Sequence, residues 1–150
     1  MNQGVSSLQG QGGFTLVEVL VTLSIVAALG TLMIPNRRPP AQAQLRADTN
    51  HLVAALRITR SAAVSQNRDM TFLLDTARRT FSSQVVPLGT IDSRTEIKME
   101  TFDALRFESL GGIQFFASGR STGGRIRLEL GPFKTRIHVI WATGNVAVME

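Results

Sequence analysis

Residues 14–34 read FTLVEVLVTLSIVAALGTLMI, the longest apolar run in the chain. The run contains no Lys or Arg and has one charged residue, Glu18. A helix rises about 1.5 Å per residue, so this run would extend over roughly 31 Å, close to the hydrocarbon thickness of a bilayer. Because Pro35 ends the run, we predict a transmembrane helix over residues 14–35.

A short polar leader, residues 1–13, precedes this helix and ends in Gly12-Gly13. A secretory signal peptide has a charged start and carries its small residues after the apolar core. Here the small residues come before the apolar run. Cleavage after Gly13 would therefore leave the helix attached to the mature chain.

Glu18 is the unusual residue of the run, because an ionised carboxylate deep in a bilayer costs about 2.5–3.5 kcal/mol and is a functional hypothesis by default. A new amine at Phe14 would be its natural counter-ion, either within one helix or between two helices packed side by side. The other interpretation is an interfacial carboxylate that only reaches toward water. The residues by themselves leave these alternatives open.

The segment Gly13-Phe14-Thr15-Leu16-Val17-Glu18 resembles the processing motif G-F-T-L-x-E of type IV pilins and type II secretion pseudopilins. The resemblance implies that a prepilin peptidase cleaves between Gly13 and Phe14 and N-methylates Phe14. It also implies that Glu18 guides subunit register in a helical filament. Many members of this group carry a helix-kinking proline at the position of Pro35.

The charges around the helix conflict with the orientation that the resemblance implies. Family leaders usually carry Lys or Arg, whereas here Arg37 and Arg38 follow the helix. Basic flanks normally stay in the cytoplasm. The resemblance instead implies a single pass through the bacterial inner membrane with the C-terminal domain in the periplasm. We adopt it because the motif is more specific than two arginines; a start codon upstream of Met1 that adds basic residues would remove the conflict.

The rest of the chain, from Asn36 on, is long enough for one domain of about 115 residues. It holds all 16 basic residues and 10 of the 11 acidic residues, a net charge of about +6. Such a surface permits contact with nucleic acid, anionic lipid or acidic protein and specifies none of them. The chain has no cysteine, which removes thiol catalysis and thiolate metal sites.

Helical periodicity resumes at Ala41, after Pro39-Pro40, and runs to about Asn67. The apolar positions fall on one face: Leu45, Leu52, Val53, Leu56 and Ala63. The charged positions fall largely elsewhere: Arg46, Asp48, Arg57, Arg60 and Arg68. We therefore predict that residues 36–67 continue the stem as an amphipathic helix and cover one side of a sheet.

Residues 68–150 change to a period of two and predict a β-rich globular domain. The expected strands are 70–75, 81–85, 96–100, 113–117, 125–130, 135–141 and 146–149, with 87–94 as a loop and 101–110 ambiguous. The predicted fold class is α+β: a long N-terminal helix, half transmembrane and half amphipathic, packed on an antiparallel sheet or sandwich.

Two further segments are similar to one branch of this group, the GspH minor pseudopilins. Residues 113–126 match their hairpin I-x-F-F-x-x-G-x-S-x-G-G-x-I, and residues 141–146 match their closing turn W-x-T-G-x-V. The resemblance implies a structural subunit of the type II secretion pseudopilus that binds other pseudopilins and needs no cofactor. One ring of Phe115-Phe116 should lie on the outer face as a candidate subunit contact.

Catalytic and metal-site interpretations have little support in the residues. Ser121 lies in a G-x-S-x-G pattern, but a Gly-rich turn and a strand follow it, and no Asp occurs later in the chain. The glycines are better explained by positive φ in a hairpin. His51 and His138 are too few for a metal site, and Asp48 with His51 should form a solvated pair. We therefore expect neither an enzyme nor a bound metal.

Five basic residues gather around the last strands: Arg120, Arg125, Arg127, Lys134 and Arg136. In the related FimT group of type IV minor pilins, C-terminal arginines bind DNA during uptake. This resemblance makes a FimT-like minor pilin, active in pilus assembly or DNA uptake, the alternative function. An ordinary solvated outer face is the other interpretation, because Ile126 and Leu128 alternate with the arginines.

Overall fold

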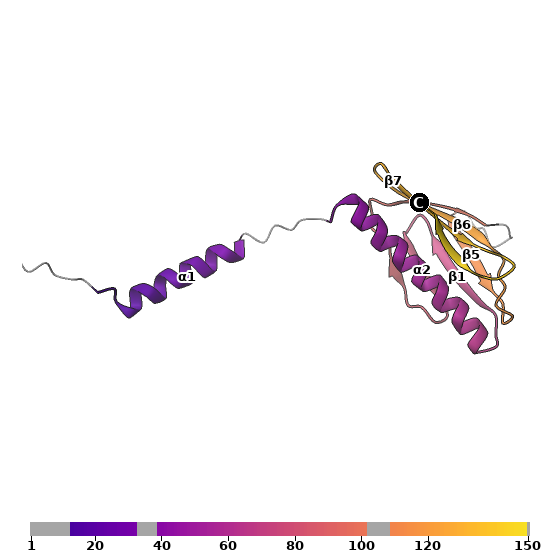
Figure 1. The fold of residues 1–150 in the computed structure, drawn as a ribbon, viewed down its shortest axis with the longest axis horizontal. Coiled ribbons are helices and arrows are strands. Elements are labelled where there is room, and N and C mark those ends of the chain that lie inside the picture. The colour runs from indigo at the N-terminus through magenta and orange to yellow at the C-terminus, as the bar shows by residue number, and fades with distance from the viewer. Residues whose placement is uncertain (1–12, 33–38, 102–108, 150) are drawn as a thin grey trace, which may run out of the picture. The chain divides into compact units, whose positions relative to one another are not determined.

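The computed structural model describes residues 13–32, 39–101 and 109–149 (Figure 1). The chain divides into two compact units, Met1–Arg38 and Pro39–Glu150, and each is described by itself. The first unit holds helix α1, and the second holds helix α2 and all the described strands.

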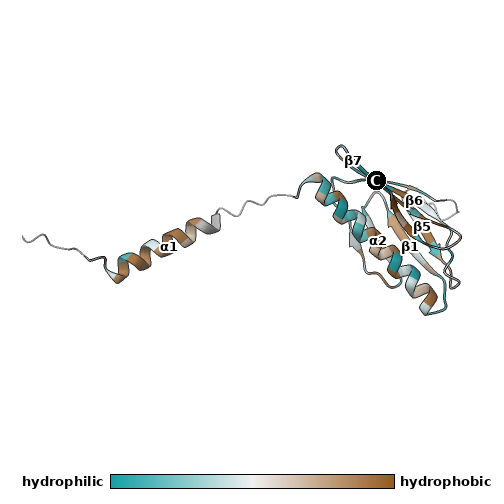
Figure 2. Ribbon diagram, in the orientation of Figure 1, coloured by the Kyte–Doolittle hydropathy of each residue, from teal (hydrophilic) through white to brown (hydrophobic). Residues whose placement is uncertain are grey.

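Helix α1 spans Leu16–Leu32 and lies within the predicted range 14–35. Apolar residues predominate along the helix and are not gathered on one face (Figure 2). Those described, from Leu16 to Leu29, are exposed within this unit. The described residues include no helix with both the length and the apolar character that a membrane crossing requires.

Helix α2 spans Ala41–Ser65 and begins where the sequence predicts. Pro40 is the N-cap residue: it is extended, with ψ 146°, and its carbonyl accepts the first helical hydrogen bond from the Gln44 N–H (3.0 Å). Positive φ at Asn67 (48°) follows the end of the helix. Pro39 and Pro40 lie in the predicted range 36–67 but are not helical, and residues 36–38 lie outside the described residues.

The described strands form two four-stranded antiparallel sheets, a division that the predicted antiparallel sheet or sandwich left open. The first sheet has the order β3-β2-β1-β5, with β1 Met70–Asp75, β2 Thr80–Ser83, β3 Gly89–Thr90 and β5 Leu110–Phe115. The second has the order β4-β6-β7-β8, with β4 Glu96–Glu100, β6 Gly124–Leu130, β7 Phe133–Val139 and β8 Val146–Met149.

Strand β3 corrects the prediction that residues 87–94 form a loop. Two residues are too few to show alternation in the sequence. They pair because Gly89 lies opposite Phe81 and Thr90 opposite Thr80 in strand β2. A Cβ at Gly89 would overlap the Phe81 ring, so glycine is needed at this pairing.

Helix α2 packs against strands of both sheets, and one continuous core lies beneath it (Figure 1). All five apolar positions predicted for its inner face are buried. The strands contribute alternate residues, most regularly in β6, where Ile126 and Leu128 are fully buried and the alternating Arg125 and Arg127 are exposed. Phe72 and Phe81 stack within this core with ring centroids 6.0 Å apart.

Asp48 is buried on this same face, contrary to the prediction, because it lies three residues after Leu45 and four before Leu52. Its carboxylate accepts hydrogen bonds from the Thr95 hydroxyl (2.6 Å) and from Gln44 Nε2 (3.0 Å). Thr95 is itself fully buried just before β4. The pair therefore fixes the loop before β4 to helix α2.

Arg60, near the end of α2, joins the two turn motifs of the second half of the chain. Its guanidinium donates to the Gly119 carbonyl (3.3 Å) and to the Thr143 carbonyl (2.8 and 3.1 Å). Gly144 has φ +64°, and a Cβ there would overlap the Gly119 carbonyl oxygen and press on the Arg60 side chain. The glycine is required both for its backbone conformation and for this close approach.

We predict that Gly144→Ala lowers the free energy of unfolding by more than Gly131→Ala. Both residues have left-handed φ, but a Cβ at Gly131 meets no atom within 4 Å. In the control, Gly131→Ala, the free energy of unfolding should fall by about 1–2 kcal/mol from backbone strain alone. In Gly144→Ala it should fall by about 1–3 kcal/mol more, because the Cβ overpacks this site. Urea denaturation of both variants measures the difference, and equal losses would contradict the close approach.

We also predict that Asp48→Ala lowers the free energy of unfolding by about 1–3 kcal/mol, because it leaves the buried Thr95 hydroxyl without its acceptor. The double variant Asp48→Ala/Thr95→Val should lose less than the sum of the two single variants. Chemical denaturation of all four proteins tests this coupling. Strict additivity would show that the hydrogen bond contributes nothing.

Candidate functional site

The predicted cleavage point lies immediately before helix α1. Gly13 and Phe14 are exposed, Phe14 with 81% of its surface accessible, and the helix begins two residues later at Leu16. The Gly13–Phe14 bond is therefore outside regular structure and open to another protein. Pro35, the predicted kink, lies outside the described residues.

Glu18 occupies the first turn of α1, and its backbone N–H donates to the Thr15 hydroxyl (3.2 Å). Thr15 is thus the N-cap and Glu18 the third helical residue, the spacing of a capping box. The positive end of the helix dipole also favours a carboxylate here. Sequence reasoning missed this function of Thr15-x-x-Glu18, although the spacing is visible in the sequence.

Two hydroxyl groups of α1 are satisfied within the helix. Thr22 donates to the carbonyl of Glu18 (2.9 Å), and Ser24 donates to the carbonyl of Leu20 (2.7 Å). Such back-bonding removes the need for water at these positions. Glu18 forms no ion pair with any other described residue, so its carboxylate is left for another molecule.

The other predicted site lies on the outer face of the second sheet, where β4, β6 and β7 run side by side. The strand register places the outward side chains in three cross-strand rows. They are Glu100–Arg125–His138, Lys98–Arg127–Arg136 and Glu96–Glu129–Lys134. We call the middle set, Lys98, Arg127 and Arg136, the cationic row.

Each outer row holds one ion pair, and the cationic row holds none among the described residues. Arg125 lies 3.8 Å from the Glu100 carboxylate, and Lys134 lies 3.4 Å from the Glu129 carboxylate. The three side chains of the cationic row are exposed and form no ion pair within the described part of the chain. Like charges directly opposite one another on neighbouring strands are destabilising. A bound anion would reduce this repulsion, so the row could bind one from outside the chain.

The structure brings together four of the five predicted basic residues and adds one. Arg125, Arg127, Lys134 and Arg136 share the outer face, together with Lys98 of β4, which sequence reasoning missed. The outward alternation of β4 exposes Lys98, but only the register places it beside Arg127. Arg120 lies outside the rows and stacks over the Trp141 ring, 5.3 Å from its centroid.

Ser121 has a structural position rather than that of a nucleophile. Its side chain is buried, accepts a hydrogen bond from the Gly123 N–H (3.1 Å) and donates to the Ile140 carbonyl (3.3 Å). Gly119 and Gly123 adopt positive φ, as the hairpin interpretation requires. Phe115 is fully buried and its neighbour Phe116 half-buried, so Phe116 stays a candidate contact.

The expected solvated pair of Asp48 with His51 is wrong, because Asp48 turns inward to Thr95 while His51 is exposed. In the described part of the chain, no group of three His, Asp or Glu residues is placed to hold a metal ion.

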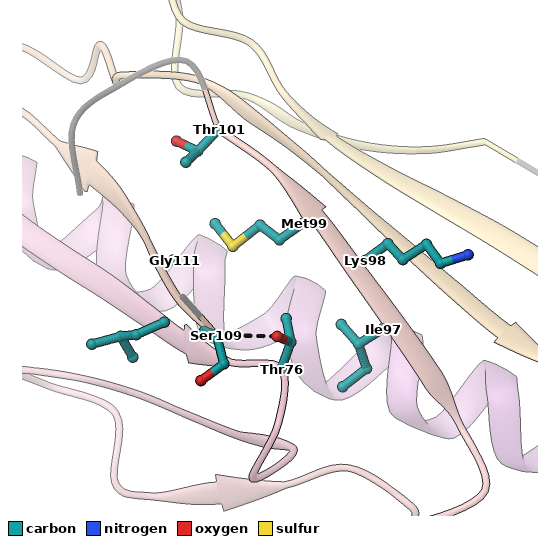
Figure 3. Close-up of a pocket in the computed structure, with 8 residues that line it drawn as sticks. Thr76, Ile97, Lys98, Met99, Thr101, Ser109 and Gly111 are labelled. Atoms are coloured by element: carbon teal, nitrogen blue, oxygen red, sulfur yellow. Dashed lines mark hydrogen bonds between the residues drawn. The ribbon is translucent and has the colours of Figure 1, made fainter. Parts of the chain in front are cut away.

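An open depression of about 220 Å³ lies between β4 and the start of β5 (Figure 3). Met99 points into it toward Gly111, and the Thr76 hydroxyl is already engaged with the Ser109 carbonyl (3.0 Å). Among the described residues that line it, Lys98 is the one with a charged side chain. We assign it no ligand.

Comparison with known proteins defines the class first. A family profile described as "Prokaryotic N-terminal methylation motif" matches residues 8–34. The fold resembles the type IV minor pilin FimU of Pseudomonas aeruginosa, with a TM-score of 0.56, 16% identity and coverage of 73% of this chain and 90% of that one. It also resembles the minor pseudopilin EpsH of Vibrio cholerae, with a TM-score of 0.59, 10% identity and coverage of 73% and 98%. The protein is thus of the type IV pilin-like class.

A second profile, "Type II transport protein GspH", matches residues 48–144. The chain is also 30% identical over 136 residues to a protein of Xanthomonas campestris pv. campestris named type II secretion system protein H, covering 89% of this chain and 80% of that protein. The chain belongs to the GspH family.

Two charged side chains in turns have shifted pKa values, and both lie away from the cationic row. The pKa of Asp75 is lowered, first because the Arg78 backbone N–H donates to it (2.9 Å), with a second bond from Ala77 (3.0 Å); burial acts in the opposite direction. The hydrogen bond with Asp92 raises the pKa of Arg94. Both shifts result from hydrogen bonds within local turns.

We predict that Asp75→Asn destabilises the protein in a pH-dependent way. A carboxyl whose folded-state pKa is lowered adds stability above its unfolded pKa, about 3.9, and this is lost as pH falls through the folded-state pKa. The variant should therefore unfold at lower urea than the native chain at neutral pH, and the difference should vanish in acid. A difference that stays constant with pH would contradict a charge-dependent turn.

Proposed function

We propose that this chain is a minor pseudopilin, a structural subunit of the type II secretion pseudopilus that takes part in protein export across the outer membrane. One observation carries the proposal: the methylation motif at residues 8–34 precedes a GspH domain at 48–144 in a single chain. The name of its Xanthomonas relative supports the same system. The action is structural: the protein works by joining other pseudopilins.

Processing comes first in this proposal. A prepilin peptidase removes residues 1–13 and methylates the new amine of Phe14. The exposure of Gly13 and Phe14 ahead of α1 supports access to the bond. Residues 14–35 then hold the protein in the inner membrane by a single pass, with the C-terminal domain in the periplasm.

Assembly follows through the stem. The apolar side chains of α1 from Leu16 to Leu29 are exposed within their own unit and gain stability when other stems cover them. Glu18 meets the methylated Phe14 amine of a neighbouring subunit. Its lack of an ion pair among the described residues, and its position in the first turn, support this contact.

The alternative from the sequence, a FimT-like minor pilin active in pilus assembly or DNA uptake, stays a prediction. The likeness to FimU is one of fold at 16% identity and does not choose between the two systems. A titration of the native chain and of Arg127→Glu with a short DNA duplex measures DNA binding by the basic residues.

We predict that Glu18→Ala leaves leader cleavage intact but reduces incorporation into the pseudopilus by at least about tenfold, because it leaves a desolvated amine without its partner. Mass spectrometry of the N-terminus measures processing, and crosslinking of sheared pseudopili measures incorporation. Unchanged incorporation would contradict this function of Glu18. A chain recovered with Met1 still in place would contradict the processing step.

Glu18→Gln is the matched control for the capping box. Gln preserves the capping-box pattern but removes the charge. If the charge guides assembly, Glu18→Gln should fail as Glu18→Ala does. Native incorporation of Glu18→Gln would instead assign Glu18 to helix capping alone.

A further inference from the structure

The cationic row is a surface whose charges are not balanced within the described chain. Lys98, Arg127 and Arg136 lie directly opposite one another on three neighbouring strands. Neighbouring strands are about 4.8 Å apart, so the three side chains crowd like charges into roughly 10 Å. All three are exposed, and no carboxylate lies within ion-pair distance of them among the described residues.

Carboxylates flank the cationic row on β4 and β6 but not on β7. Two residues along the strands from the row lie Glu96 and Glu100 on β4 and Glu129 on β6, and the basic residues beside the row are Arg125 and Lys134. These two basic side chains already lie near carboxylates, Arg125 at 3.8 Å from Glu100 and Lys134 at 3.4 Å from Glu129. The three cations of the row have no such partner among the described residues, and one or two carboxylates side by side would fit over them.

An apolar depression of about 540 Å³ adjoins the row at the end of β7. It is formed by Val139, Ile140 and Trp141 together with the Thr122–Gly124 turn. Ile140 is 43% and Trp141 61% exposed, so apolar surface is available there. Arg120 stacks over Trp141, and Trp and Arg are the residues most enriched at protein-binding hot spots.

The depression and the cationic row form one surface. Arg125 and His138 line both the depression and the shallow groove over Lys98, Arg127 and Arg136. Both residues come from the cross-strand row nearest the depression. A bound segment could therefore occupy both parts at once without leaving the protein surface.

We propose that this surface binds an acidic segment of a partner protein, which places an apolar side chain in the depression and one or two carboxylates over the cationic row. The proposal takes from the proposed function only that this domain meets other proteins. A second copy of the chain fits poorly, because symmetric pairing would oppose the two cationic rows and each chain carries a net charge of +5.

The experiment titrates the full-length chain, in a non-ionic detergent, with a short synthetic peptide that carries several Glu residues around one central Phe. Binding should weaken as salt is added. It should weaken at least about tenfold on Arg127→Glu and several-fold on Trp141→Ala, because each removes one half of the surface. Peptides with Glu replaced by Gln, or Phe by Ser, should lose affinity in parallel.

Arg68→Glu is the matched control. Arg68 is exposed beyond the end of α2, forms no ion pair among the described residues, and its reversal changes the net charge by the same amount as Arg127→Glu. It should leave the dissociation constant within about twofold. Thermal unfolding of the three variants checks that each remains folded.

Three outcomes would overturn the proposal. Equal weakening by Arg68→Glu would show a general charge effect, and equal affinity for the Gln peptide would show that the row takes no part. Tighter binding of a short DNA duplex, lost on Arg127→Glu, would assign the surface to nucleic acid. If the chain binds the peptide but does not enter pseudopili, the proposed function is refuted while the binding surface proposed here is supported.

Discussion

The apolar face of helix α2 is the feature on which the rest of the domain depends. Leu52 and Leu56 are fully buried, and α2 contacts strands of both sheets. Neither sheet could bury its inner face without it, since short strands gain little stability from pairing alone. Because one helix packs on both sheets, its buried face is wide enough to include Asp48. The buried carboxylate of Asp48 would destabilise the fold without the hydrogen bond that the Thr95 hydroxyl donates to it.

Arg60 connects α2 to two turns in the second half of the chain by hydrogen bonds. Its guanidinium contacts carbonyls in both segments that resemble the GspH family, the turn at Gly119 and the turn at Thr143. The two segments are far apart in sequence, yet they form one corner of the fold. Their glycines and the buried Ser121 are explained by backbone geometry at this corner, so the serine needs no catalytic explanation.

The two candidate sites follow different physical rules. In α1 a lone carboxylate sits in an otherwise apolar helix, and its free energy depends on what surrounds that helix. On the outer sheet face the surroundings are aqueous, and the cross-strand neighbours decide which charges are paired. Arg125 and Lys134 have acidic partners there, while Arg127 has cations on both sides. We propose the first site for assembly through stems and the second for recognition of a partner by the domain.

The sequence by itself determined the features that come from local periodicity: the apolar run at 14–34, the inner face of α2 and the alternation of β6. It also carried the motifs that identify the family. Only the tertiary structure decided the division into two sheets, the pairing of the short strand β3, and the buried bond of Asp48 to Thr95. The cationic row belongs with these, because Lys98, Arg127 and Arg136 meet through strand register. Arg127 and Arg136 belong to one hairpin, but Lys98 lies on a strand distant in the chain, and only the register of β4 with β6 places it beside Arg127.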